Sequence, residues 1–107
     1  MKDKIVSGYG MSYKRLTKTS ARKAFDNGMD VYVMSADRNP VNSMTSPHIY
    51  SKGCKALCYW VKPEIDTFDD LLQDFSEWLF VDGYGHMPQR YYVRNYRFSY
   101  WIREEQL

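Results

Sequence analysis

The chain has 107 residues, a formal net charge of +2 at pH 7 and a hydrophobic content of 44%. This length suits one hydrophobic core, and an aromatic content of 17% favours a folded chain over a disordered one. No apolar run reaches the ~18 residues of a membrane-spanning helix, and Met1–Val6 lacks the apolar stretch of a signal peptide. We therefore expect one domain over residues 1–107, located in a cytoplasm and without membrane contact.

The N-terminal third predicts a strand, a short helix and a second strand. Residues 1–10 carry two glycines and several charges, which indicates a loose N-terminal arm or a short edge strand. Met11–Leu16 is a candidate strand, and Thr17 is a suitable N-cap for a helix over Lys18–Asn27. The inward side of this helix is predicted to consist of Ala21, Ala24 and Phe25. Val31–Ser35 is rich in β-branched and aromatic residues, which is typical of a strand.

The middle of the chain contains a long loop and two weaker strand signals. Residues 36–47 are rich in Asn, Pro, Ser and Asp, so we expect a loop that either contacts a partner or serves as a connector. His48–Tyr50 and Lys55–Val61 are candidate strands, with Ser51–Gly53 as the turn between them. Apolar residues occur on both alternating sides of Lys55–Val61, so the pattern does not decide which side of this strand faces the core.

The strongest periodic signal predicts a helix that begins after Thr67 and ends before Asp82-Gly83. Thr67 is a good N-cap, and Asp69 and Asp70 follow at the positive end of the helix dipole. Apolar residues recur at steps of three and four and lie on one helix face: Phe68, Leu71, Leu72, Phe75, Trp78 and Leu79. This face is wide enough to cover a single core.

The C-terminal part predicts a β segment over Gln89–Arg103. The alternation of aromatic and apolar residues along this segment changes register near Arg94-Asn95. One extra residue moves all the side chains that follow to the other sheet face, so a bulge or a hairpin turn is required there. Together these elements predict an α+β fold, with two helices packed on one face of a small mixed, mostly antiparallel sheet of four to five strands.

Charges are segregated along the chain. Residues 1–62 have a balance of +7, residues 63–88 a balance of −7, and residues 89–107 a balance of +2. Such segregation can create a surface for a charged partner, although charge alone favours a solvated helix face.

Two candidate binding surfaces follow from this layout. The first is a row of carboxylates on or beside the acidic helix, which would face a basic groove on a protein partner: Asp66, Asp69, Asp70, Asp74 and Glu77. The alternative is a small nucleic-acid-binding domain, whose cations would contact phosphates: Lys14, Arg15, Lys18, Arg22, Lys23, Arg94 and Arg97. Tyr92 and Tyr96 alternate with the C-terminal arginines and would supply rings for base stacking.

The sequence shows no motif for catalysis or for a cofactor. Cys54 and Cys58 with His48 and His86 lack the ligand spacing of a structural zinc site. On a strand the two cysteines would lie ~13 Å apart, too far for a disulfide, so we expect free thiols. There is neither a nucleophile elbow nor a glycine-rich phosphate loop. We therefore expect no enzyme activity, no cofactor and no metal.

A family resemblance adds a functional expectation. Five sequence features follow one another along the chain: a short helix ending in Asn27-Gly28, a strand over residues 31–36, an Asn39-Pro40 loop, a Thr67-Phe68-Asp69 helix start and the aromatic run Arg90–Val93. Over residues 11–93 this order resembles a group of small proteins carried by bacterial phages and mobile elements. Some proteins of this group resemble anti-CRISPR inhibitors of type II effector nucleases.

The resemblance implies a role outside catalysis. It implies a non-enzymatic accessory protein that works in the cytoplasm of a bacterial host. Its partner would be a host protein or ribonucleoprotein complex, in particular an RNA-guided nuclease whose binding to DNA it blocks. The oligomeric state is left open.

Overall fold

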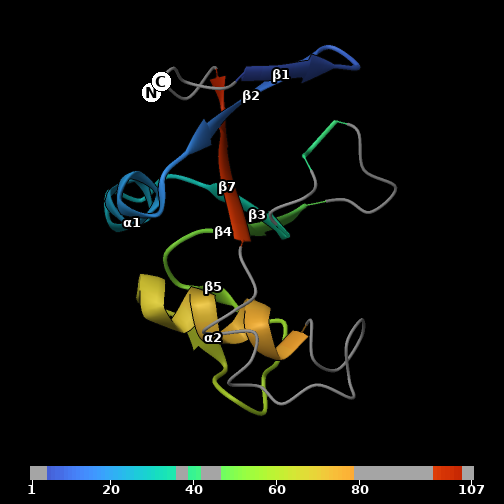
Figure 1. The fold of residues 1–107 in the computed structure, drawn as a ribbon. Coiled ribbons are helices and arrows are strands. Elements are labelled where there is room, and N and C mark those ends of the chain that lie inside the picture. The colour runs from blue at the N-terminus through green and yellow to red at the C-terminus, as the bar shows by residue number, and fades with distance from the viewer. Residues whose placement is uncertain (1–4, 36–38, 42–46, 79–97, 105–107) are drawn as a thin grey trace.

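The computed structural model describes residues 5–35, 39–41, 47–78 and 98–104 (Figure 1). Five strands form the main sheet: β1 (Ile5–Gly8), β2 (Met11–Leu16), β3 (Val31–Ser35), β4 (His48–Tyr50) and β7 (Phe98–Arg103). Two short strands form a separate pair: β5 (Cys54–Lys55) and β6 (Glu64–Ile65). The helices are α1 (Lys18–Asp26) and α2 (Phe68–Trp78).

The strand order of the main sheet is β1-β2-β7-β3-β4, and every pairing among the described strands is antiparallel. The last strand in the sequence therefore lies at the centre of the sheet. Its residue Trp101 is paired with Arg15 on β2 and with Tyr32 on β3. The N-terminal hairpin and the β3–β4 pair are thus joined only through β7 within the described sheet.

Helix α1 follows from local capping signals. The Thr17 side chain accepts a hydrogen bond from Ser20 N at 3.1 Å, and Gly28 follows the helix with a φ of 84°. A left-handed backbone at that position suits glycine because it has no Cβ. The predicted helix and its three buried inward residues are confirmed, and the helix ends one residue earlier than predicted, at Asp26.

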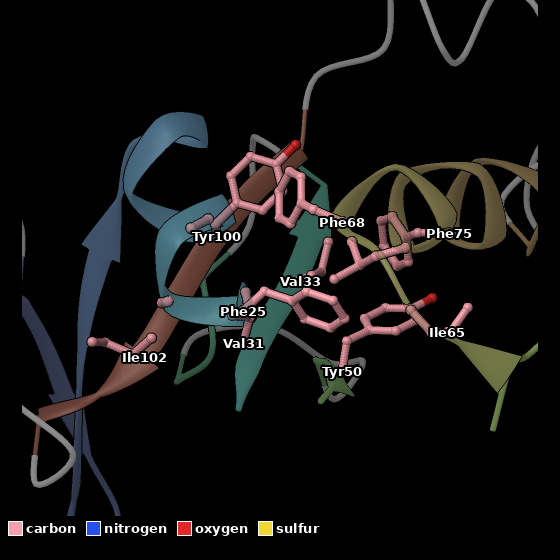
Figure 2. Close-up of a cluster of buried hydrophobic side chains, with 12 residues drawn as sticks. Phe25, Val31, Val33, Tyr50, Ile65, Phe68, Phe75, Tyr100 and Ile102 are labelled. Atoms are coloured by element: carbon pink, nitrogen blue, oxygen red, sulfur yellow. The ribbon is translucent and has the colours of Figure 1, made fainter. Parts of the chain in front are cut away.

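Both helices pack on the same face of the sheet, as predicted. Figure 2 shows Phe25 of α1 and Phe68 of α2 in one cluster of buried side chains with Val31 and Val33 of β3. The ring centroids of Phe25 and Phe68 are 6.3 Å apart. The Phe68 ring also lies 5.6 Å from the ring of Tyr100 on β7. This shared core confirms the predicted α+β architecture with two helices on one sheet face.

The opposite sheet face carries a second apolar cluster that the sequence did not predict. Tyr13, Tyr32 and Trp101 are buried there, and the two tyrosine rings meet edge to face at 5.1 Å. Trp101 is fully buried and its indole N–H donates to Ser99 Oγ at 2.9 Å. The Arg15 guanidinium lies 5.7 Å from the centroid of the Trp101 ring. The central strand β7 is therefore packed on both sides.

The structure decides between the two alternatives for the N-terminal residues 1–10, a loose arm or a short edge strand. Within the described part of this segment, Ile5–Gly8 form an edge strand, β1. The predicted strand over Lys55–Val61 is wrong, because strand β5 ends at Lys55 and a turn occupies the following residues. The physical reason is that the backbone N–H groups of Leu57 and Cys58 donate to the side chain of Asp74 on α2 instead of to a neighbouring strand.

Other predictions fall partly or wholly outside the described residues. Within the predicted loop over residues 36–47, positions 39–41 and 47 are neither helix nor strand, and the remaining positions are not described. The predicted change of register near Arg94-Asn95 also lies outside the described residues. Among the described helices, none has the length and apolar character needed to cross a membrane.

Candidate functional site

The N-terminus of α2 is closed by a reciprocal cap. Thr67 Oγ1 accepts from Asp70 N at 3.1 Å, while Asp70 Oδ2 accepts from Thr67 N at 3.1 Å and from Asp66 N at 3.3 Å. The same carboxylate binds Lys62 Nζ at 2.9 Å. The hydrogen bond from Lys62, assisted by those from the backbone, lowers the pKa of Asp70 although partial burial opposes the shift. Asp70 is thus occupied with contacts inside the chain.

This cap predicts a pH-dependent contribution to stability. The pKa of Asp70 is lower in the folded chain than in the unfolded chain, where it is about 4. The ionised carboxylate therefore stabilises the fold above about pH 4, and this stabilisation is lost as the pH falls through the pKa of the folded chain. We expect Asp70→Asn to lower the free energy of unfolding by about 1 kcal/mol at pH 7 and by much less at pH 2. Urea unfolding at both pH values measures this. An equal deficit at both would contradict it.

Asp74 is buried and links α2 to the segment before it. Its side chain, 2% exposed, accepts from Tyr50 Oη at 2.9 Å, from Leu57 N at 2.9 Å and from Cys58 N at 2.8 Å. Burial, followed by the charge and hydrogen bond of Asp74, raises the pKa of Tyr50 well above its usual range. The prediction that Asp74 belongs to an exposed acidic row is therefore wrong.

The other acidic residues differ in exposure. Asp69 is 77% exposed at its side chain and pairs with Arg22 at 3.0 Å, and Asp66 is exposed. Glu77 is half-buried, and its Oε2 is out of solvent without a hydrogen-bond partner in the described structure. The five predicted carboxylates thus do not form one row. Asp66 and Asp69 are the two that face solvent, at and just before the start of α2.

The predicted basic cluster is also divided. Lys14 and Arg15 are consecutive on β2 and so point to opposite sheet faces, opposite Ile102 and Trp101 respectively. Arg22 pairs with Asp69, and its guanidinium carbon lies 4.9 Å from the Phe68 ring centroid. Two more members are exposed on α1, Lys18 and Lys23, whereas Arg94 and Arg97 lie outside the described residues. The structure therefore does not bring this set together as one surface.

A surface that sequence reasoning missed lies at residues 57–61, here named the aromatic turn. Leu57 is 38% exposed, Tyr59 75% and Trp60 57%. The Tyr59 and Trp60 rings meet edge to face with centroids 5.8 Å apart, and Val61 N donates to Cys58 O at 2.9 Å. The sequence carried a usable signal against a strand here. A half-buried strand is apolar on one side only, whereas Lys55–Val61 has apolar residues on both alternating sides.

The cysteines and histidines provide no metal centre in the described part of the chain. Cys54 and Cys58 are not joined by a disulfide, as predicted, although the strand over Lys55–Val61 on which that prediction relied is absent. No group of three or more His, Cys, Asp or Glu residues within the described ranges is placed to hold a metal ion. His86 lies outside those ranges.

Comparisons with protein-family models, with curated proteins and with solved structures find no match. Two features of the described surface are candidates for contact with a partner. These are the exposed carboxylates of Asp66 and Asp69 and the aromatic turn.

Proposed function

We propose that this chain is a non-enzymatic inhibitor, carried by a phage or mobile element, that binds a host RNA-guided type II nuclease and blocks its binding to DNA. The observation that supports this proposal is the acidic surface at the start of α2, where Asp66 and Asp69 are exposed. It belongs to a segment, residues 48–78, with three lysines and six acidic residues. The family resemblance supplies the class of target.

The proposed mechanism is electrostatic occlusion. A nuclease that holds a guide RNA and target DNA has a positively charged channel, which attracts an acidic surface and speeds association. Asp69 already pairs with an arginine, Arg22, in an exposed contact. Exposed ion pairs contribute little to the free energy of folding. Asp69 can therefore exchange Arg22 for a cation of the partner at a small cost in free energy. A carboxylate placed in that channel excludes the phosphates of DNA.

The double variant Asp66→Asn, Asp69→Asn tests this mechanism. It should weaken inhibition at least tenfold, because it removes the two exposed carboxylates while retaining the Asp70 cap and buried Asp74. Binding of labelled target DNA to the guide-loaded nuclease, titrated with each protein, measures inhibition. The matched control, Asp26→Asn with Glu104→Gln, neutralises two exposed acids outside α2 and should inhibit like the wild type.

Full inhibition by the Asp66, Asp69 variant would contradict the mechanism. A shift of bare DNA or RNA by the wild-type protein, weakened steeply by salt, would instead favour direct nucleic-acid binding. In that case Lys18 and Lys23, the exposed cations of α1, are the residues to replace first.

A further inference from the structure

Exposed apolar side chains are concentrated in the aromatic turn. The described residues include six large hydrophobic side chains that are exposed, and three of them, Leu57, Tyr59 and Trp60, fall within four consecutive positions. Single exposed apolar residues are ordinary on a protein surface, whereas a cluster that includes Trp and Tyr is typical of an interaction site. The aromatic turn is therefore a candidate contact surface.

The turn is exposed although its backbone is firmly held. Leu57 N and Cys58 N donate to the buried carboxylate of Asp74, and Ala56 N donates to Pro63 O at 3.1 Å across the base of the turn. The Cys58 side chain is buried beneath the turn. Because the backbone is already fixed, the turn loses less conformational entropy when it binds a partner, and this favours binding.

The charges around the turn distinguish between classes of partner. Lys55 lies opposite Glu64 in the β5–β6 strand pair, and Lys62 forms an ion pair with Asp70. Each of the two cations that flank the turn therefore has a carboxylate on a neighbouring strand or helix. Nucleic acid needs uncompensated cations for its phosphates, so the charge balance disfavours stacking of bases on these rings. It favours a protein partner.

We infer that the aromatic turn anchors the protein to its target by inserting Trp60 and Tyr59 into an apolar pocket that lies within a positively charged protein surface. This inference rests on the proposed function, because the pocket belongs to the same nuclease. The turn and the acidic surface are contiguous: Lys62, which follows the turn, binds the Asp70 carboxylate that also accepts from Asp66 N. Aromatic anchor and carboxylates therefore act as centre and rim of one interface.

The test compares single variants for binding to a guide-loaded type II nuclease by biolayer interferometry. Trp60→Ala should weaken binding on the order of 30-fold and Tyr59→Ala about 10-fold, as for buried aromatic anchors. Trp60→Phe, which retains a ring, should lie between Trp60→Ala and the wild type. The matched control is Ile49→Ala, which removes an apolar side chain of similar exposure, 55%, from β4 and should bind within about threefold of the wild type.

Each outcome decides between the two proposals. If Trp60→Ala binds like the wild type while the Asp66, Asp69 variant does not, the inference is overturned and the proposed function stands. If the wild type binds no nuclease, both are overturned. Quenching of Trp60 fluorescence by oligo(dT) or by phosphatidylcholine vesicles, identified by its loss in Trp60→Phe, would assign the turn to nucleic acid or lipid and overturn the inference.

Discussion

Replacing Asp74 with alanine should lower the free energy of unfolding by about 3 kcal/mol and release the aromatic turn. The carboxylate accepts three hydrogen bonds in a buried position, from Tyr50 Oη, Leu57 N and Cys58 N. Alanine leaves these three donors without a partner, and each buried unpaired polar group costs free energy. No other described side chain accepts from the backbone of both Leu57 and Cys58.

Urea unfolding of the full chain, followed by far-UV circular dichroism, measures this loss. Asp69→Ala is the matched control, because the side chain is 77% exposed and its loss should change the free energy of unfolding by less than about 0.5 kcal/mol. Tyr50→Phe removes one donor and should cost about 1 kcal/mol. An Asp74→Ala protein as stable as Asp69→Ala would show that the buried carboxylate does not hold the turn.

Replacing Trp101 with alanine should lower the free energy of unfolding by about 3–5 kcal/mol. Trp101 is fully buried on the central strand β7, where its neighbours in the second cluster are Tyr13 and Tyr32. The substitution leaves a large cavity and removes the hydrogen bond that the indole N–H donates to Ser99 Oγ. Domains of this size are stable by about 5–15 kcal/mol, so the variant should be near its unfolding threshold.

Thermal and urea unfolding of Trp101→Ala and Trp101→Phe give the required comparison. Phenylalanine fills part of the cavity and should restore part of the stability. Ile49→Ala, on the edge strand β4 with a side chain 55% exposed, serves as the control on the same sheet. A Trp101→Ala protein within about 1 kcal/mol of the wild type would mean that the second cluster does not contribute to the core.

The local elements of this fold could be predicted because their causes lie close together in the sequence. Thr17 and Thr67 each cap a helix through a backbone N–H three residues ahead. Gly28 supplies a left-handed backbone directly after α1. Apolar spacing identified the buried faces of both helices. Capping and periodicity act within one or two turns, so a sequence pattern records them.

The candidate site was predictable only in part, because its residues depend on distant contacts. Asp74 follows the spacing of a surface acid on α2, but its partners Tyr50, Leu57 and Cys58 lie 24, 17 and 16 residues away. The same contacts turn a predicted strand into an exposed aromatic turn. Nothing within one helix turn of Asp74 shows that its carboxylate is buried.

The sequence by itself determined the two helices, most of the strands and the separation of basic and acidic segments. Only the tertiary structure decided that β7 occupies the centre of the sheet, that Arg22 pairs with Asp69, and that Asp66 and Asp69 are the predicted carboxylates left in solvent. The physical reason is the range of the interactions along the sequence. Propensity, capping and amphipathic spacing are local, whereas strand order, ion pairing and the burial of a charge are set by segments that meet only when the chain folds.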